Sequence, residues 1–222
     1  MVDGVAETWQ LRWVGKTRPV CAANDGFTCP CAGFAYGEGG DLILVRLRKQ
    51  VEIDRLQITR LFDEPFRGEG RIAIVPRWPE DVKSDLENEG DKNFPALVAK
   101  RPVVHLMSVA DYDHDGRATE FYLQVSTEPC GKSVGVSRGN SRLHAFGKAS
   151  NPSKPLRLHR EEWEAIRDAS GPIEVTDWLC GDHGSESEVT LRLRWGAGGV
   201  DGTRHTCTCP PNARRLAKVG PL

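Results

Sequence analysis

The sequence predicts a mainly β fold, an antiparallel sandwich or barrel-like sheet with one short helix. Several segments alternate apolar and polar residues with a period of two, and 23 glycines and 14 prolines punctuate the chain. A single segment shows helical spacing instead. Since 39% of the 222 residues are hydrophobic, the chain suffices for one sizeable core, and we expect a single β-rich domain over residues 1–222.

The clearest strands lie near the two ends of the chain. In "TWQLRWV" the apolar residues share one face of the strand: Trp9, Leu11 and Trp13. In "SEVTLRLRW" one face is apolar: Val189, Leu191, Leu193 and Trp195. Its opposite face is polar: Thr190, Arg192 and Arg194. This alternation is typical of antiparallel strands with one buried face.

The segments between these two complete the expected fold. Further strands are predicted for "DLILVRLR", "RIAIV", "PVVHLMSVA", "EFYLQVS" and "PIEVTDWL". "EIDRLQITRLF" fits a strand or a helix, and its neighbours favour a strand. In "LHREEWEAIRDASG" the apolar residues stand near helical spacing, which predicts one helix near 160–169. The polar stretch 79–95 lies between two prolines and predicts a long surface loop.

The charge and hydropathy of the chain exclude two classes of partner. Lys plus Arg is 30 and Asp plus Glu is 31, so there is no strongly basic field to attract nucleic acid. No apolar run reaches the length of a membrane-spanning helix. The first ten residues have no basic start and no apolar stretch, so no signal peptide is predicted from them.

Residues 110–121, "ADYDHDGRATEF", carry the strongest functional signal. Three aspartates occupy positions 1, 3 and 5 of a loop: Asp111, Asp113 and Asp115. Gly116 at position 6 permits a sharp turn, and Arg117 at position 7 would offer its backbone carbonyl. Calcium takes six to eight oxygen ligands, so a loop must fold around the ion. This spacing meets the early requirements of an EF-hand type loop.

The second half of the loop departs from the EF-hand pattern. An EF-hand closes with a glutamate at position 12, which here is Tyr122, and the first acid after the turn is Glu120. The flanking segments also read as strands rather than helices. In these respects Asp111–Glu120 resembles the strand–loop–strand calcium loops of FG-GAP and VCBS-type proteins, where D-x-D-x-D-G is followed by one more acid. The resemblance covers this one loop and implies a calcium ligand set that ends with Glu120.

A second interpretation of the loop needs no metal. Asp-rich sequences are common in solvated turns between strands. Three alternating carboxylates nevertheless repel one another, which favours a bound cation. Calcium suits this set of oxygens better than magnesium, which prefers to keep its water ligands. We therefore expect Ca²⁺ bound by these residues: Asp111, Asp113, Asp115, Arg117 and Glu120.

Seven cysteines leave three interpretations open. Cys29 and Cys31 could form a zinc site with Cys207 and Cys209 if the two chain ends meet. Disulfides are the second interpretation, with Cys130 and Cys180 as one candidate pair, and buried free thiols are the third. We favour disulfides, because a loop of this kind suits extracellular calcium, where modules bind at about 10⁻⁴ to 10⁻³ M.

The sequence also offers one candidate for enzymatic chemistry. "GVSRG" (135–139) fits the nucleophile-elbow pattern G-x-S-x-G, although no helical pattern follows Ser137. The candidate partners of this serine are Asp182, His183 and His205. Since no catalytic constellation stands out, we expect a secreted or periplasmic, bacterial-type calcium-binding β module. Its calcium would be structural, and its partner a protein or carbohydrate. The alternative is a hydrolase that uses Ser137 with a His or Asp partner.

Overall fold

The structure, a computed structural model, describes residues 6–20, 34–61, 73–79, 107–123, 125, 132–139, 142–148, 151–196, 199–209 and 215–222. Within these ranges the protein is mainly β, with several antiparallel sheets and a single α-helix. The predicted fold class is therefore confirmed. None of the described helices is both long and apolar enough to cross a membrane.

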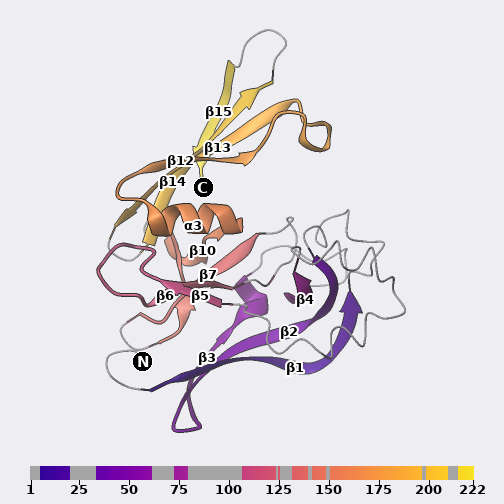
Figure 1. Ribbon diagram of the computed structural model, residues 1–222, viewed down its shortest axis with the longest axis vertical. Coiled ribbons are helices and arrows are strands. Elements are labelled where there is room, and N and C mark those ends of the chain that lie inside the picture. Colours follow the sequence, from indigo (N-terminus) through magenta and orange to yellow (C-terminus); the bar gives the residue numbers. More distant parts are fainter. Residues whose placement is uncertain are drawn as a thin grey trace.

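Three larger sheets follow one another along the chain (Figure 1). The N-terminal sheet contains β1 (Thr8–Val20), β2 (Phe34–Arg48), β3 (Val51–Gln57) and β4 (Ala73–Pro79). The central sheet contains β5 (Met107–Ala110), β6 (Glu120–Leu123), β7 (Ser133–Ser137), β8 (His144–Ala145) and β11 (Arg157–Leu158). The C-terminal sheet contains β12 (Ile173–Trp178), β13 (Ser187–Gly196), β14 (Gly199–Thr208) and β15 (Arg215–Pro221).

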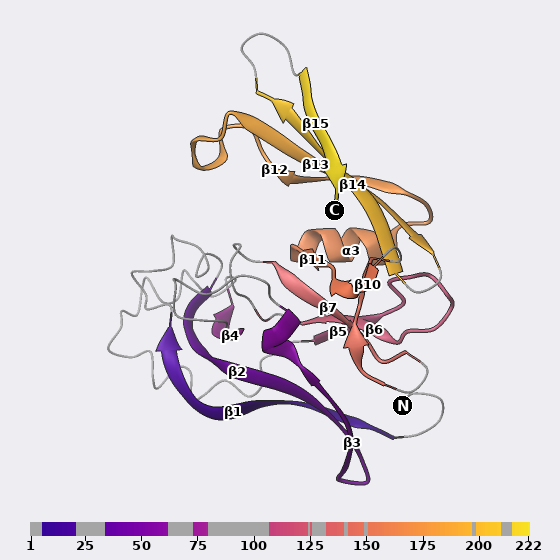
Figure 2. The same ribbon diagram turned by 180° about the vertical axis from the view of Figure 1, so that it is seen from behind.

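The smaller elements connect these sheets. β9 (Gly147–Lys148) and β10 (Asn151–Pro155) form a two-stranded sheet. The helix α3 (Arg160–Asp168) precedes β12, and two short 3-10 turns occur, η2 (Ile58–Leu61) and η4 (Asp182–Gly184). In the two opposite views α3 lies between the central and C-terminal sheets, and the N-terminal sheet lies on the other side of the central sheet (Figures 1 and 2).

The strands β6 and β7 of the central sheet are buried on both faces. All four residues of β6 are buried, and so are all five of β7. Phe121 and Leu123 pack into the cluster shared with the N-terminal sheet, whereas Tyr122 packs into the cluster shared with α3 and the C-terminal sheet. Consecutive residues of a strand point to opposite faces, so one strand supplies both cores.

β1 and α3 begin where the sequence predicts them, whereas β2 begins at Phe34, ahead of the predicted segment, and β4 extends beyond its predicted segment to Pro79. Trp9, Leu11 and Trp13 are partly buried and pack on the core between the N-terminal and central sheets, as the alternation indicates. The helix ends within one residue of its predicted bound and buries Trp163 and Ile166. A Cβ at Gly135 of β7 would stand 2.6 Å from the Trp163 ring, so only glycine allows this tryptophan to reach the sheet.

Several expectations need correction. "EIDRLQITRLF" is a strand only through Gln57, and a 3-10 turn follows. The strands near the two chain ends, whose meeting the zinc interpretation requires, lie in different sheets: β1 pairs with β2, whereas β13 pairs with β12 and β14. Thr190, expected on a solvent face, is buried. The expected loop near 79–95, apart from Pro79, and the first part of "PVVHLMSVA" lie outside the described residues.

Candidate metal centre

The aspartate loop connects β5 to β6 in a hairpin. Ala110 and Glu120 are paired across the two strands, so residues 111–119 form the connection. The side chains of Asp111, Asp113 and Asp115 converge there, with one carboxylate oxygen of each lying within 4.8 Å of the other two. This convergence is the arrangement that the alternate spacing predicts for a loop curled around an ion.

Carboxylate oxygens also hold the backbone of this loop in shape. The amide N–H of Asp115 donates to Oδ1 of Asp111 at 3.0 Å, and that of Gly116 donates to Oδ2 of the same residue at 2.8 Å. The N–H of Arg117 donates to Oδ1 of Asp115 at 2.8 Å. Gly116 has φ of 89°, a left-handed conformation that favours glycine. The sequence therefore predicts the sharp turn correctly.

Glu120 is the most unusual acid of the hairpin. Its residue exposure is only 2%, and its Oε1 accepts hydrogen bonds from the hydroxyls of Thr119 and Ser137. Its other oxygen, Oε2, is buried and has no hydrogen-bond partner. Burial first, and then the negative charges of Asp113 and Asp115, raise the pKa of Glu120 to about 7, although the two hydroxyls act in the opposite direction.

The donor set defines what this centre can bind. The three carboxylates that converge on it offer only oxygen, and the buried Glu120 carboxylate at the start of β6 lies outside this compact group. Oxygen ligands without sulfur or imidazole suit a hard cation such as calcium. A cation would offset the mutual repulsion of the aspartates, and it would give the unpartnered Glu120 oxygen the charge partner that a buried carboxylate needs.

Of the five expected ligand residues, the structure brings three together and places the other two elsewhere in the hairpin. The compact group consists of Asp111, Asp113 and Asp115. Arg117 lies at the expected turn position, and its carbonyl accepts a hydrogen bond from the N–H of Thr119 at 2.9 Å, which leaves one lone pair of that oxygen. Glu120 lies at the closing pair of the hairpin. Calcium coordination by these five residues stays a prediction.

The cysteines require one correction. Cys180 forms a disulfide with Cys209, so the proposed pairing of Cys180 with Cys130 is wrong. This bond also removes Cys209 from a four-thiolate zinc site, while Cys207 is a free thiol. The disulfide joins the residues that follow β12 and β14. In the sheet, β13 lies between these two strands, so the bond bridges across the end of β13. Three of the remaining cysteines, Cys21, Cys29 and Cys31, lie outside the described residues, as does Cys130.

Ser137, Asp182 and His205 of the hydrolase alternative lie in different secondary-structure elements. Ser137 ends β7 of the central sheet, is 5% exposed, and accepts a hydrogen bond from the N–H of Gly139 at 2.9 Å. Its own hydroxyl donates to Glu120. His205 belongs to β14 of the C-terminal sheet, where its Nε2 contacts the Thr203 hydroxyl at 2.9 Å, and Asp182 begins η4. No contact among the described residues joins Ser137 to either of them.

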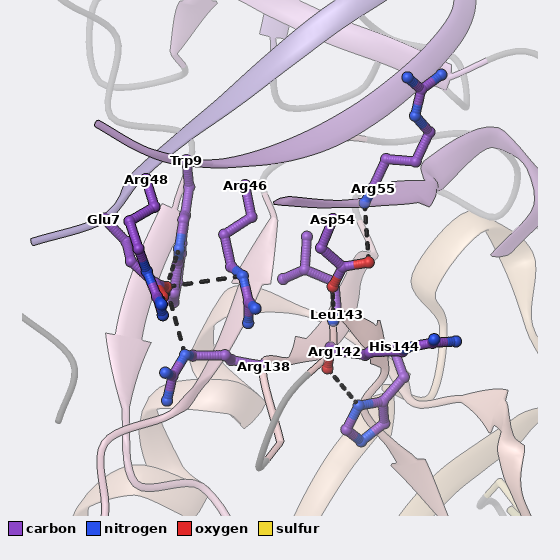
Figure 3. A network of polar contacts seen from close by, with 10 residues as sticks. All are labelled: Glu7, Trp9, Arg46, Arg48, Asp54, Arg55, Arg138, Arg142, Leu143 and His144. Carbon is purple, nitrogen blue, oxygen red and sulfur yellow. Dashed lines mark hydrogen bonds and ion pairs between the residues drawn. The ribbon is translucent and has the colours of Figure 1, made fainter. Parts of the chain in front are cut away.

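A second buried polar cluster was not expected from the sequence. Glu7, whose side chain is 2% exposed, contacts the guanidinium groups of three arginines (Figure 3): Arg46, Arg48 and Arg138. The charge of Arg138 reaches Glu7 at 3.4 Å, between the central and N-terminal sheets. Burial alone would raise the pKa of Glu7, but its bonds to Arg48 and Trp9 and the charges of Arg46 and Arg138 hold it below its usual value.

One signal in the sequence could have located this cluster. In "DLILVRLR" Arg46 follows Leu42 and Leu44 at a spacing of two, so it shares their core-facing side of β2. A buried arginine requires a carboxylate partner. The identity of that partner was not predictable, because Glu7 comes from a segment ahead of β1 that carries no distinguishing pattern.

Comparisons with known proteins name no relative for this fold or this centre. The chain matches no protein-family model, no curated protein and no solved structure.

Proposed function

We propose that this protein is a calcium-binding β module and that one Ca²⁺ occupies the β5–β6 hairpin loop. The observation that carries the proposal is the buried, unpartnered Oε2 of Glu120, on a hairpin whose loop gathers three aspartate carboxylates within 4.8 Å. The ligands are Asp111, Asp113, Asp115, the carbonyl of Arg117 and Glu120. The resemblance to the calcium loops of FG-GAP and VCBS-type proteins supports the same assignment.

The calcium has a structural role in this proposal. All five ligand residues come from one hairpin, so the ion ties the end of β5 to the start of β6. A catalytic metal usually keeps a position open for water or substrate, and it takes its ligands from several elements. Here the ion neutralises the loop and fixes the strand pair at the centre of the fold.

The module acts outside the cytosol and serves in binding rather than catalysis. The Cys180–Cys209 disulfide supports this placement, because such bonds persist mainly in oxidising compartments. A single calcium loop of this kind has a modest affinity, which extracellular calcium would satisfy. The partner is a protein or carbohydrate, and nucleic acid is disfavoured by a net charge of −1.

Thermal unfolding tests the proposal. Calcium should raise the melting temperature and a chelator should lower it, since a ligand that binds the native state stabilises it by mass action. At a calcium concentration of 100 Kd the stabilisation is about 2.7 kcal/mol. Asp113→Ala should remove most of this shift, and Asp182→Ala, the same substitution at an exposed aspartate in η4, should leave it intact. A melt that is unchanged across millimolar calcium would reject the proposal.

A further inference from the structure

The residues between the three aspartates contact the helix layer. Tyr112 is fully buried, and its ring meets that of Trp163 in α3 edge-on at 5.4 Å. His114 reaches the carbonyl of Ile166 in α3 with Nε2 at 2.8 Å. Its ring also stacks on Trp195 of β13 at 4.5 Å. The loop thus alternates metal-facing acids with residues that hold it against α3 and the C-terminal sheet.

The contact of His114 with α3 satisfies a need of the helix. Ile166 belongs to the last four residues of α3, whose carbonyls have no partner within the helix. A side-chain N–H that reaches such a carbonyl caps the helix end. The loop residue therefore completes α3, although it lies far from the helix in sequence.

The backbone at His114 adopts a conformation that is consistent with its being held in place by these contacts. Its φ is 56°, in the left-handed region that non-glycine residues rarely adopt. Such a conformation persists where the surroundings stabilise it. Because His114 stands between Asp113 and Asp115, the rotation of its backbone sets the direction of both flanking carboxylates.

We propose that His114 is a positioning residue that couples occupancy of the metal loop to the docking of α3 and β13 on the central sheet. This inference rests on the proposed function and adds a regulatory property to it. A bound cation fixes the loop in the conformation that presents His114 to Ile166 and Trp195. By linkage, the docked helix layer favours cation binding in return. Elements that contribute no ligand would then be stabilised by the metal.

Hydrogen exchange monitored by mass spectrometry, with calcium ions as the probe, tests this coupling. In the wild type, calcium should slow amide exchange in residues 111–120 and also in α3, the latter by at least about fivefold, the lower range of allosteric couplings. In His114→Gly the loop should still be protected, whereas α3 should lose its calcium-dependent protection. Glycine accepts a positive φ, so this variant removes the side-chain contacts without adding strain at the turn.

Controls separate failure of this inference from failure of the proposed function. His205→Ala alters a histidine of the C-terminal sheet whose ring contacts Thr203, and it should retain the calcium effect on α3. Protection of the loop without any effect on α3 in the wild type would overturn the coupling and leave the calcium site standing. Equal protection of α3 in His114→Gly and the wild type would overturn the role of His114. Absence of a calcium effect on the loop itself would overturn both proposals.

Discussion

Two glutamates of this protein have little exposed side-chain surface, and their surroundings have opposite charge. The side chain of Glu7 is 2% exposed, although its residue as a whole is half-buried, and Glu120 as a whole residue is 2% exposed. Glu7 faces Arg46, Arg48 and Arg138, which hold its pKa below the usual value. Glu120 faces Asp113 and Asp115, and its pKa rises to about 7, with burial as the largest cause. The countercharge of Glu7 is thus built from the chain itself, whereas we infer that Glu120 and the loop take theirs from solution.

The two sites lie at the two faces of one strand end. Ser137 of β7 donates to Glu120 on the face toward α3. The next residue, Arg138, reaches Glu7 on the face toward the N-terminal sheet, and its backbone N–H donates to the carbonyl of Thr119 at 3.1 Å. Because strand residues alternate in direction, neighbouring positions serve opposite electrostatic roles. The comparison predicts that equivalent substitutions at the two sites act with opposite sign.

The largest effect is expected at Glu7. Glu7→Gln removes the carboxylate that faces two buried arginines, Arg46 and Arg138, and loss of one partner of a buried ion pair destabilises a protein by about 3–5 kcal/mol. Denaturant unfolding measures this change, which should not depend on calcium. Glu174→Gln serves as the control, because its bond to Arg192 is exposed and worth less than about 1 kcal/mol. If Glu7→Gln lost no more stability than Glu174→Gln, the arginines would not provide the charge that compensates Glu7.

The pH dependence of stability should also differ in sign. The pKa of Glu7 is lowered in the folded state, so its contribution is present at neutral pH and is lost as the pH falls below about 4. The pKa of Glu120 is raised to about 7, so the metal-free protein should lose stability, on the order of 2 kcal/mol, as the pH rises from about 4.5 to 7. Glu120→Gln should remove this loss in denaturant titrations at several pH values.

Glu162 of α3 provides the matched control for that experiment. It is buried, its Oε1 has no partner, and its pKa is likewise raised to about 7 by burial first and then by Asp177, while the His159 N–H and Lys132 oppose the rise. It lies outside the metal loop, so its pH dependence should persist in saturating calcium. The pH dependence of Glu120 should vanish there. Equal responses of the two glutamates to calcium would remove the distinction between the loop and an ordinary buried acid.

The smallest expected effect is an increase in stability, at Asp113. In the presence of a chelator, Asp113→Asn removes one of three converging negative charges and should stabilise the protein by about 0.5 kcal/mol, comparable to relief of a like-charge pair. Glu7→Gln destabilises under the same conditions. Melting temperatures of the two variants in chelator measure both signs. Destabilisation by Asp113→Asn similar to that by Glu7→Gln would mean that the aspartates are satisfied without a cation.

The features of the fold that depend on residues close together in the chain could be predicted from the sequence. The strand faces of β1, the span of α3 and the convergence of the aspartates follow from periods of two or near four and from the position of Gly116. Partners that are distant in the chain were missed or mispaired. Glu7 meets Arg138 through the order of the sheets, and Cys180 meets Cys209 through the order of the strands within the C-terminal sheet. Periodicity carries no information on that order, so neither partner could be predicted.

Calorimetric titration with calcium tests the central claim, that the countercharge of the loop is a cation from solution. The wild type should bind one Ca²⁺ per chain with a Kd of about 10⁻⁴ to 10⁻³ M, as expected for an extracellular module. Asp113→Asn should show little or no binding, while Glu7→Gln, measured where it remains folded, should bind as the wild type does. No binding up to several times this concentration, or equal binding by Asp113→Asn and the wild type, would contradict the claim.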